Sequence, residues 1–372
     1  MHVKTLDLLS FRNYERLQFC PSDGLNVLFG ANAQGKSGIL EAVYLLATSK
    51  SHRASRDVDL IRVGDEAARA CAASIRSESA DCSVEIILSR KEKKCVKINS
   101  VRHNRIADII GQLKAVVFSA LDIEMVRGEP DLRRRFLNLE VSQVSPQYVF
   151  ALGRYKRSLE QRNSLLREIK CELASTQMLD AWDAQVAEYG AAVIAKRHGF
   201  CNALSGIAAQ VYGFLTDSKE ALEVSYRPSL QMEDAESESD IREVFMRELA
   251  ERRFVDIQRG TTTIGPHRDD IEFVISGLDA RDYASQGQQR TAAIAVKLAE
   301  VELIEQESGE TPVVLLDDAG AELDELRRNR VVEKVAGGCQ TFITTTRPEE
   351  LGSGLLQAAA LFEVKSGTVT RT

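Results

Sequence analysis

The start of the chain changes from the two-residue period of a strand to the longer period of a helix. The runs "VKTLDLLSF" and "LNVLFG", separated by the turn "PSDG", fall within residues 1–30 and are typical of strands. The next stretch, "KSGILEAVYLLATS", places its apolar side chains at helical spacing: Ile39, Leu40, Val43, Leu46 and Ala47. The pattern therefore predicts a strand, a short glycine-containing loop and a helix, in that order.

Two further patterns follow along the chain. Residues 68–118 hold the short runs "ACAASIRS", "CSVEIILSR", "KCVKINSV" and "KAVVFS", which predict antiparallel strands joined by polar turns. From about Leu132 to residue 255 the chain is rich in Ala, Leu, Glu, Gln and Arg, and apolar residues share helical faces. They are Val186, Tyr189, Val193 and Ile194 in one segment and Ile241, Val244, Phe245 and Leu249 in another. The acidic stretch "MEDAESESD" interrupts this region and is predicted to be a mobile linker.

Strand-like sequence returns after the helical region, in "DIEFVISG", "TPVVLLDD", "CQTFITTT" and "AALFEVKSG". We therefore predict an α/β unit with mixed sheets, formed by residues 1–131 and 256–372. A helical insertion domain at residues 132–255 separates its halves. The length of 372 residues also favours two units, because one hydrophobic core rarely serves more than about 250–300 residues.

Composition narrows the classes of function. The net charge of −7 provides no general attraction for nucleic acid or anionic membrane, so any polyanion must bind a local basic patch. The seven cysteines are scattered and form no CxxC pair, and the five histidines are dispersed. This favours a reducing cytosol over a disulfide framework or a zinc site. We find no apolar segment of signal-peptide or membrane-spanning type, and we expect a cytoplasmic protein without membrane contact.

The loop between the predicted strand and helix, "GANAQGKS", matches the phosphate-binding pattern G-x-x-x-x-G-K-[ST]. Its glycines let backbone N–H groups converge on an anion, and the helix N-terminus adds positive potential. Lys36 is expected to reach the β- and γ-phosphates of ATP, and Ser37 to ligate Mg²⁺. The alternative is a glycine-rich turn of purely structural role. The predicted ATP-binding residues are Gly30, Ala31, Asn32, Ala33, Gln34, Gly35, Lys36 and Ser37.

Two carboxylates end the apolar run in "TPVVLLDDAGAELDE". A buried parallel strand delivers its last side chains to the carboxyl edge of a sheet, where ligands bind. Asp317 is suited to hold Mg²⁺, directly or through water, and Asp318 to polarise the attacking water. A strand ending in an ordinary Asx turn is the structural alternative.

A third polar cluster, "SQGQQ", lies at the start of a predicted helix. The chain already has one predicted phosphate site, so the ligand of this second cluster has to be found elsewhere. Ser285 can cap the helix, whose N-terminus then attracts an anion. A second anion site makes sense if it meets the γ-phosphate held by another copy, so that two protomers enclose two ATP molecules. Gly287 allows close approach, and Gln288 and Gln289 can donate without charge. A plain N-capped helix is the alternative.

Taken together, these motifs resemble the RecF family, bacterial recombination and gap-repair ATPases of the SMC and Rad50-like branch of ABC ATPases. The resemblance covers nearly the whole chain. It rests on "SFRNYE", "GANAQGKS", "SHRASRDVDLIRVG", "DLRRRFLN", "GPHRDD", "SQGQQRT" and "FITTT". It implies an ABC-type ATPase head with a helical insertion domain, and weak ATP hydrolysis that serves as a dimerisation switch.

The resemblance also implies residue roles. Asp317 and Asp318 match the Walker B pair. The signature motif that acts on the partner's ATP is matched by Ser285, Gln286, Gly287, Gln288 and Gln289. Asp324 matches the D-loop residue at the dimer interface, and Arg12 the position that reaches nucleotide phosphates. Thr345 or Thr346 occupies the switch region. The chain departs from the family pattern at Ala120, Ala284 and Ala321.

DNA binding is implied by the resemblance rather than by composition. The expected ligands are double-stranded and gapped DNA, held mainly by backbone contacts. The partners implied are RecR and RecO, in DNA damage repair, recombination, replication and the SOS response. Each basic cluster has an ordinary solvated surface as its alternative. The candidate residues are Arg53, Arg56, Arg102, Arg105, Arg133 to Arg135, Arg154, Lys156 and Arg157.

Other functions remain open. In a transporter ATPase subunit the P-loop and the signature lie much closer than the roughly 250 residues between Lys36 and Ser285. A Rad50-like partner of a nuclease needs a longer heptad arm than this insertion provides. A structural DNA clamp with a vestigial ATPase is the third alternative, and the intact Lys36, Asp317 and Asp318 oppose it.

Overall fold

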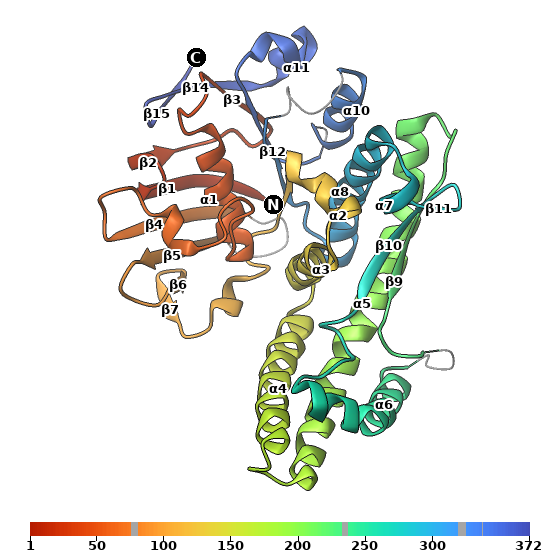
Figure 1. Ribbon diagram of the computed structural model, residues 1–372. Coiled ribbons are helices and arrows are strands. Elements are labelled where there is room, and N and C mark those ends of the chain that lie inside the picture. Colours follow the sequence, from red (N-terminus) through yellow and green to blue (C-terminus); the bar gives the residue numbers. More distant parts are fainter. Residues whose placement is uncertain (76–80, 233–236, 319–324, 337) are drawn as a thin grey trace. The chain divides into compact units, whose positions relative to one another are not determined.

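Contacts within the chain divide it into two units, and the chain passes between them more than once. The computed structural model (Figure 1) describes residues 1–75, 81–232, 237–318, 325–336 and 338–372. The first unit comprises Met1–Ile123, Phe214–Ser218 and Ala293–Thr372, and the second Glu124–Gly213 and Lys219–Ala292. Within the described residues no helix is both long enough and apolar enough to cross a membrane.

A largely parallel sheet carries the predicted phosphate loop. Its strand order is β15-β14-β3-β13-β12-β8, and only β15 runs antiparallel to its neighbour. Every residue of β8 and β12 is buried, as expected for parallel strands covered on both faces. The strands are β3 (Leu25–Phe29), β8 (Ala115–Phe118), β12 (Val313–Leu316), β13 (Thr341–Thr345), β14 (Ala360–Lys365) and β15 (Thr368–Arg371).

An antiparallel sheet, in the order β2-β1-β4-β5-β6-β7, completes the core of the first unit. Helix α1 (Lys36–Thr48) contacts β1, β4 and β5 of this sheet and β8 and β13 of the parallel sheet. Its apolar residues therefore belong to one hydrophobic core with both sheets. The strands are β1 (His2–Phe11), β2 (Tyr14–Phe19), β4 (Ala67–Ile75), β5 (Cys82–Ser89), β6 (Cys95–Ile98) and β7 (Val101–His103). Helices α10 (Glu325–Ala336) and α11 (Ser353–Ala358) belong to the same unit.

The second unit is built on long helices. The 38-residue helix α5 is the longest element, and a small antiparallel sheet, β11-β10-β9, lies in the same unit. The helices are α2 (Ile123–Arg127), α3 (Pro130–Val144), α4 (Pro146–Lys170), α5 (Leu179–Thr216), α6 (Glu238–Arg259), α7 (Ala280–Tyr283) and the start of α8 (Gln286–Ser308). The strands are β9 (Leu222–Arg227), β10 (Asp270–Ile275) and β11 (Leu278–Asp279).

The motif "GPHRDD" at residues 265–270 holds this helical unit together. Its Pro266 carbonyl accepts a 2.7 Å hydrogen bond from buried Arg197 of α5. His267 Nδ1 lies 2.6 Å from the Tyr155 hydroxyl of α4, and Asp270 accepts two hydrogen bonds from Arg133 of α3. The motif is therefore an internal junction between α3, α4, α5 and β10.

Three features differ from the predicted organisation. The run "DIEFVISG" forms β10, which pairs with β9 inside the helical unit, so residues 256–292 belong there rather than with the α/β unit. The run "KAVVFS" forms β8, which pairs parallel with β12. The last residues of the acidic stretch begin α6, where Ser237 and Asp240 form a capping box. Alternation predicts a strand, but tertiary packing selects its partner.

Candidate nucleotide-binding site

The phosphate loop adopts a backbone that only glycine allows at two positions. Gly30 follows β3 with φ 148°, and a Cβ there would lie 2.3 Å from the Val364 carbonyl oxygen of β14. Gly35 precedes α1 with φ 117°, and its Cβ would lie 2.6 Å from the Tyr14 hydroxyl. A side chain at either position would be strained by the positive φ and would collide with a neighbour, so the loop is closely fitted to its surroundings.

Two residues of the motif "SFRNYE" form hydrogen bonds with the backbone of the phosphate loop. Asn13 Nδ2 donates to the Gln34 carbonyl at 2.8 Å, and the Tyr14 hydroxyl donates to the Gly35 carbonyl at 3.0 Å. The backbone N–H of Ser366 donates to Gln34 Oε1 at 2.7 Å. Sequence reasoning assigned only Arg12 in this motif and missed the two residues that hold the loop.

Lys36 lies with its ammonium group inside the loop. Nζ donates to the carbonyls of Gly30 at 2.7 Å and Ala31 at 2.8 Å. Burial lowers the pKa of Lys36, against the attraction of Asp318 and Asp317. The side chain is therefore already directed at the space that the loop encloses.

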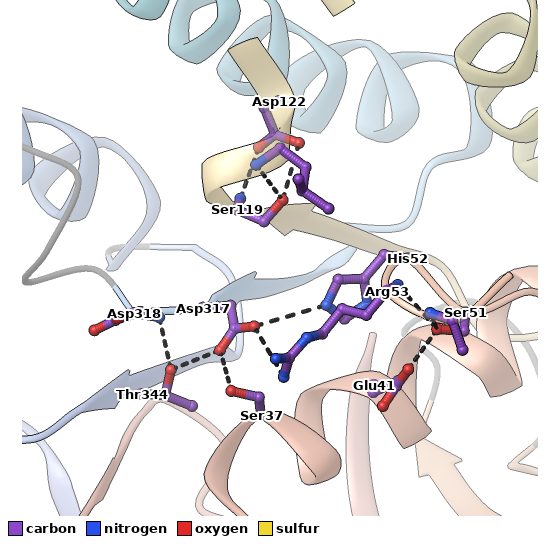
Figure 2. Close-up of polar contacts among 12 residues, drawn as sticks. Ser37, Glu41, Ser51, His52, Arg53, Ser119, Asp122, Asp317, Asp318 and Thr344 are labelled. Carbon is purple, nitrogen blue, oxygen red and sulfur yellow. Dashed lines mark hydrogen bonds and ion pairs between the residues drawn. The ribbon is translucent and has the colours of Figure 1, made fainter. Parts of the chain in front are cut away.

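Asp317 joins the loop to the end of β12 (Figure 2). Its Oδ1 accepts hydrogen bonds from the Ser37 hydroxyl at 2.7 Å and the Thr344 hydroxyl at 2.9 Å. Burial alone would raise the pKa of Asp317, but His52, Ser37, Thr344 and Arg53 together hold it below the ordinary value. A hydroxyl and an ionised carboxylate are oxygen ligands of the kind that Mg²⁺ prefers. Ser37 and Asp317 therefore fit a magnesium site.

Asp318 is held differently from its neighbour. Its backbone N–H donates to the Thr344 hydroxyl at 2.7 Å, and its φ of 55° places it in the left-handed region. The side chain is exposed and lines the cleft beside the loop. The two predicted carboxylates thus face different surroundings, one in a hydrogen-bonded pocket and one open to the cleft.

A cleft of about 840 Å³ lies over the loop. Pockets of roughly 300–1,000 Å³ are typical of small-molecule sites. Polar and charged groups dominate one part of its lining, while Ile61 and the almost fully exposed Val63 offer apolar surface. Among its lining residues are Arg12, Asn13, Asn32, Ala33, Gln34, Gly35, Lys36, Ser37, Arg53, Asp318, Thr344 and Thr346.

Arg12 lines this cleft but its guanidinium group is already bonded. Nε and Nη2 each donate to the buried Glu41 carboxylate at 2.7 Å, and Nη1 donates to the Asp59 carbonyl at 2.9 Å. The hydrogen bond with Glu41 raises the pKa of Arg12. A phosphate contact by Arg12 stays a prediction, and Glu41 is a partner that sequence reasoning missed.

The polar cluster at the start of α8 lies in the second unit. Ser285 and Gln288 form a reciprocal cap: the Gln288 N–H donates to Ser285 Oγ at 3.3 Å and the Ser285 N–H to Gln288 Oε1 at 2.8 Å. Gln288 Nε2 also donates to Glu220 at 2.7 Å, and Gln289 Nε2 to the Ala280 carbonyl at 2.9 Å.

Three residues of this cluster stay exposed: Ser285, Gln286 and Gly287. The side-chain amides of Gln288 and Gln289, which we expected to be phosphate donors, instead bond within their own unit.

Comparison with known proteins identifies the family. The sequence model described as "RecF/RecN/SMC N terminal domain" matches residues 2–370. The DNA replication and repair protein RecF of Shouchella clausii is 40% identical over 372 residues, covering 100% of both chains. RecF of Halalkalibacterium halodurans is 38% identical over 371 residues, again with 100% coverage of both. The chain belongs to the RecF family.

Solved structures agree with this assignment. A RecF structure described as "RecF-ATPrS in RecFOR pathway" superposes with a TM-score of 0.91 at 33% identity, covering 100% of this chain and 98% of that one. A "RecF-ATP" structure gives 0.92 at 32%, with 100% and 97% coverage. The Pyrococcus furiosus Smc head domain, at 0.53 and 16% over 100% of this chain and 96% of that one, shares the fold alone. The predicted ABC-type ATPase head is therefore confirmed.

The remaining predicted residues of this RecF-family chain lie in several places. Asp324 and Ala321 lie outside the described residues. Ala120 begins a short turn after β8 that Ser119 and Asp122 cap, and Ala284 directly precedes Ser285. Thr344, not Thr345, bonds to the Asp317 carboxylate, while Thr345 Oγ1 bonds to the Arg347 carbonyl and Thr346 lines the cleft.

The candidate DNA-contacting arginines separate into two groups. Arg133 is only 3% exposed, and its guanidinium group donates from Nε and Nη2 to Asp270 and from Nη1 to the Gly128 carbonyl, so it is structural. Arg134 donates to the Asp269 carbonyl at 2.8 Å. The exposed basic residues stay candidates: Arg53, Arg56, Arg102, Arg105, Arg135, Arg154, Lys156 and Arg157.

Proposed function

We propose that this chain binds ATP with Mg²⁺ and uses slow hydrolysis to switch between monomer and dimer during DNA gap repair. One observation carries the proposal. The phosphate loop, the chain of hydrogen bonds from Ser37 through Asp317 to Thr344, and the open carboxylate of Asp318 all border one cleft. The two RecF relatives described as "RecF-ATPrS" and "RecF-ATP" support a nucleotide triphosphate as its ligand.

In this proposal the loop residues 30–37 bind the phosphates through backbone N–H groups and Lys36. The apolar surface of Ile61 and Val63 would contact the base. Bound Mg²⁺ would neutralise charge on the β- and γ-phosphates. Ser37 and Asp317 would hold it, and Asp318 would orient the attacking water from the exposed side of the strand end.

The signature motif would complete the site of a second copy. Ser285, Gln286 and Gly287 are exposed at the start of α8, where backbone N–H groups lack helical partners and attract an anion. Facing the partner's γ-phosphate would give these groups a ligand. The proposal therefore includes an ATP-dependent homodimer with two composite sites.

The DNA replication and repair role of the relatives supports action on gapped or junction DNA, together with RecR and RecO, to help load recombinase. Contacts with the DNA backbone by exposed arginines would make binding dependent on salt.

Gel filtration tests the proposal directly. The chain is run alone, with ATP and Mg²⁺, and with both plus a gapped duplex. We expect a monomer alone, a dimer with ATP, and a larger complex when gapped DNA is added. A Lys36→Ala variant is the control, since it should remain monomeric throughout. A mass that is independent of ATP would contradict the proposal.

A further inference from the structure

His52, the histidine beside Asp317, is a nearly buried residue to which the proposed function gives no role. The His52 side chain is only 6% exposed. Neither ring nitrogen has a hydrogen-bond partner among the described residues. Burying a polar group without a partner is unfavourable, and such groups in native structures call for an explanation.

The ring is fixed in place from two sides. It packs edge-to-face on Tyr44 of α1, with centroids 5.4 Å apart and an interplanar angle of 87°. The preceding residue, Ser51, accepts hydrogen bonds from the backbone N–H groups of Arg53 at 2.9 Å and Ala54 at 2.7 Å and donates to Glu41. The loop is thus tied to α1, with the imidazole packed against Tyr44.

One nitrogen faces the free side of the Asp317 carboxylate (Figure 2). His52 Nε2 lies 3.8 Å from Oδ2, while Oδ1 is taken up by Ser37 and Thr344. A hydrogen bond requires about 2.7–3.2 Å, so a displacement of roughly 1 Å would form one. Arg53 Nη1 also faces Oδ2, at 3.9 Å, but its side chain is about half exposed and far less constrained.

We propose that His52 is a positioning residue for Asp317, closing on Oδ2 by donating from Nε2 and so fixing the carboxylate when Mg²⁺ and ATP bind. The inference rests on the proposed function. Partners that bond to a ligating group from behind typically change metal affinity by about 10–100-fold.

The test compares ATP dissociation constants in excess Mg²⁺ and in EDTA, because their ratio measures the coupling between metal and nucleotide. His52→Phe keeps the packing on Tyr44 and removes the donor, whereas His52→Gln retains a donor near the Nε2 position. We expect His52→Phe to reduce the ratio by about 10-fold or more, through weaker binding in Mg²⁺ alone. His52→Gln should restore most of it.

A melting curve without ligand separates positioning from folding. His52→Phe should melt no lower than the unsubstituted chain, since it removes nitrogens that have no partner. An unchanged ratio in His52→Phe, an equal loss of affinity in Mg²⁺ and in EDTA, or an equal loss in His52→Gln would overturn the inference. If the unsubstituted chain binds ATP equally well with and without Mg²⁺, the proposed magnesium site fails, and the inference with it.

Discussion

The nucleotide cleft of the first unit and the signature cluster of the second hold their polar groups in opposite ways. In the cleft, the Asp318 side chain is exposed, and Lys36 lines the open volume although its ammonium group bonds to carbonyls of the loop. The loop itself is held by residues from outside it, Asn13 and Tyr14. In the cluster, Gln288 and Gln289 already bond to groups in their own unit. The cleft is organised to receive a ligand, whereas most of the cluster's side chains build the helix start.

Few side chains of the cluster are free to contact the phosphate of a second copy. The sequence suggested Gln288 and Gln289 as two uncharged amide donors. Only Gln286 remains exposed, beside Ser285 and Gly287. Any contact with a partner's phosphate therefore comes from the Ser285 hydroxyl, the Gln286 side chain and the backbone N–H groups of the first helical turn.

The largest effect is expected at Asp318, the open carboxylate of the cleft. Asp318→Asn should lower ATP turnover by about 100-fold or more, because it removes the base that would orient water. Asparagine tolerates the left-handed backbone at this position, so the fold should persist. ATP binding and dimers should remain, as measured by titration and gel filtration. Asp23→Asn, at an exposed position, is the control, and turnover at the normal rate in Asp318→Asn would move the role elsewhere.

Lys36→Ala should weaken ATP binding by about 100-fold, the equivalent of roughly 3 kcal/mol for charge-assisted contacts. Isothermal titration with the folded variant measures this directly. Lys93→Ala removes an exposed lysine from the loop between β5 and β6 and should bind ATP normally. Unchanged affinity in a folded Lys36→Ala variant would exclude the loop as the phosphate site.

Ser285→Arg should abolish ATP-induced dimers and the hydrolysis that depends on them. The change removes the cap of α8 and places a bulky cation at the surface that would face the partner. Binding of ATP by the monomer, titrated under dilute conditions, should be unaffected. Weaker ATP binding in the monomer would indicate that the cluster serves the nucleotide of its own chain.

The smallest effects distinguish two glutamines of the cluster, Gln286 and Gln289. Gln289→Ala leaves the Ala280 carbonyl without its buried donor and should destabilise the fold by about 1–3 kcal/mol in denaturant unfolding. Gln286→Ala, at an exposed position, should change stability by less than about 0.5 kcal/mol but weaken dimerisation. If Gln289→Ala instead weakened only dimerisation and Gln286→Ala only stability, the hydrogen bonds of the cluster would not determine which residues can contact a second copy.

Sequence patterns predicted the local parts of the structure well. The strand, the glycine loop and α1 follow from short-range periodicity and from backbone requirements at Gly30 and Gly35. The cap at Ser285 is also a local signal. Such features depend on neighbouring residues, which a single sequence displays directly.

Long-range partners could not be predicted in this way. Nothing in the local pattern pairs Arg133 with Asp270, or Gln288 with Glu220, because these contacts join segments distant in sequence. The same holds for Thr344 and His52 beside Asp317. A basic cluster on a helix has the same appearance in the sequence whether it is buried in ion pairs or exposed for DNA.

Mixing two inactive variants tests the central claim, that the cleft of one chain is completed by the cluster of another. A dimer of Lys36→Ala and Ser285→Arg chains has one composite site with both defects and one with neither. If the cluster acts in trans, the mixture regains part of the ATP-dependent dimerisation and hydrolysis that each variant lacks alone. If it acts on its own chain, every site carries a defect, and a mixture as inactive as its components would contradict the account.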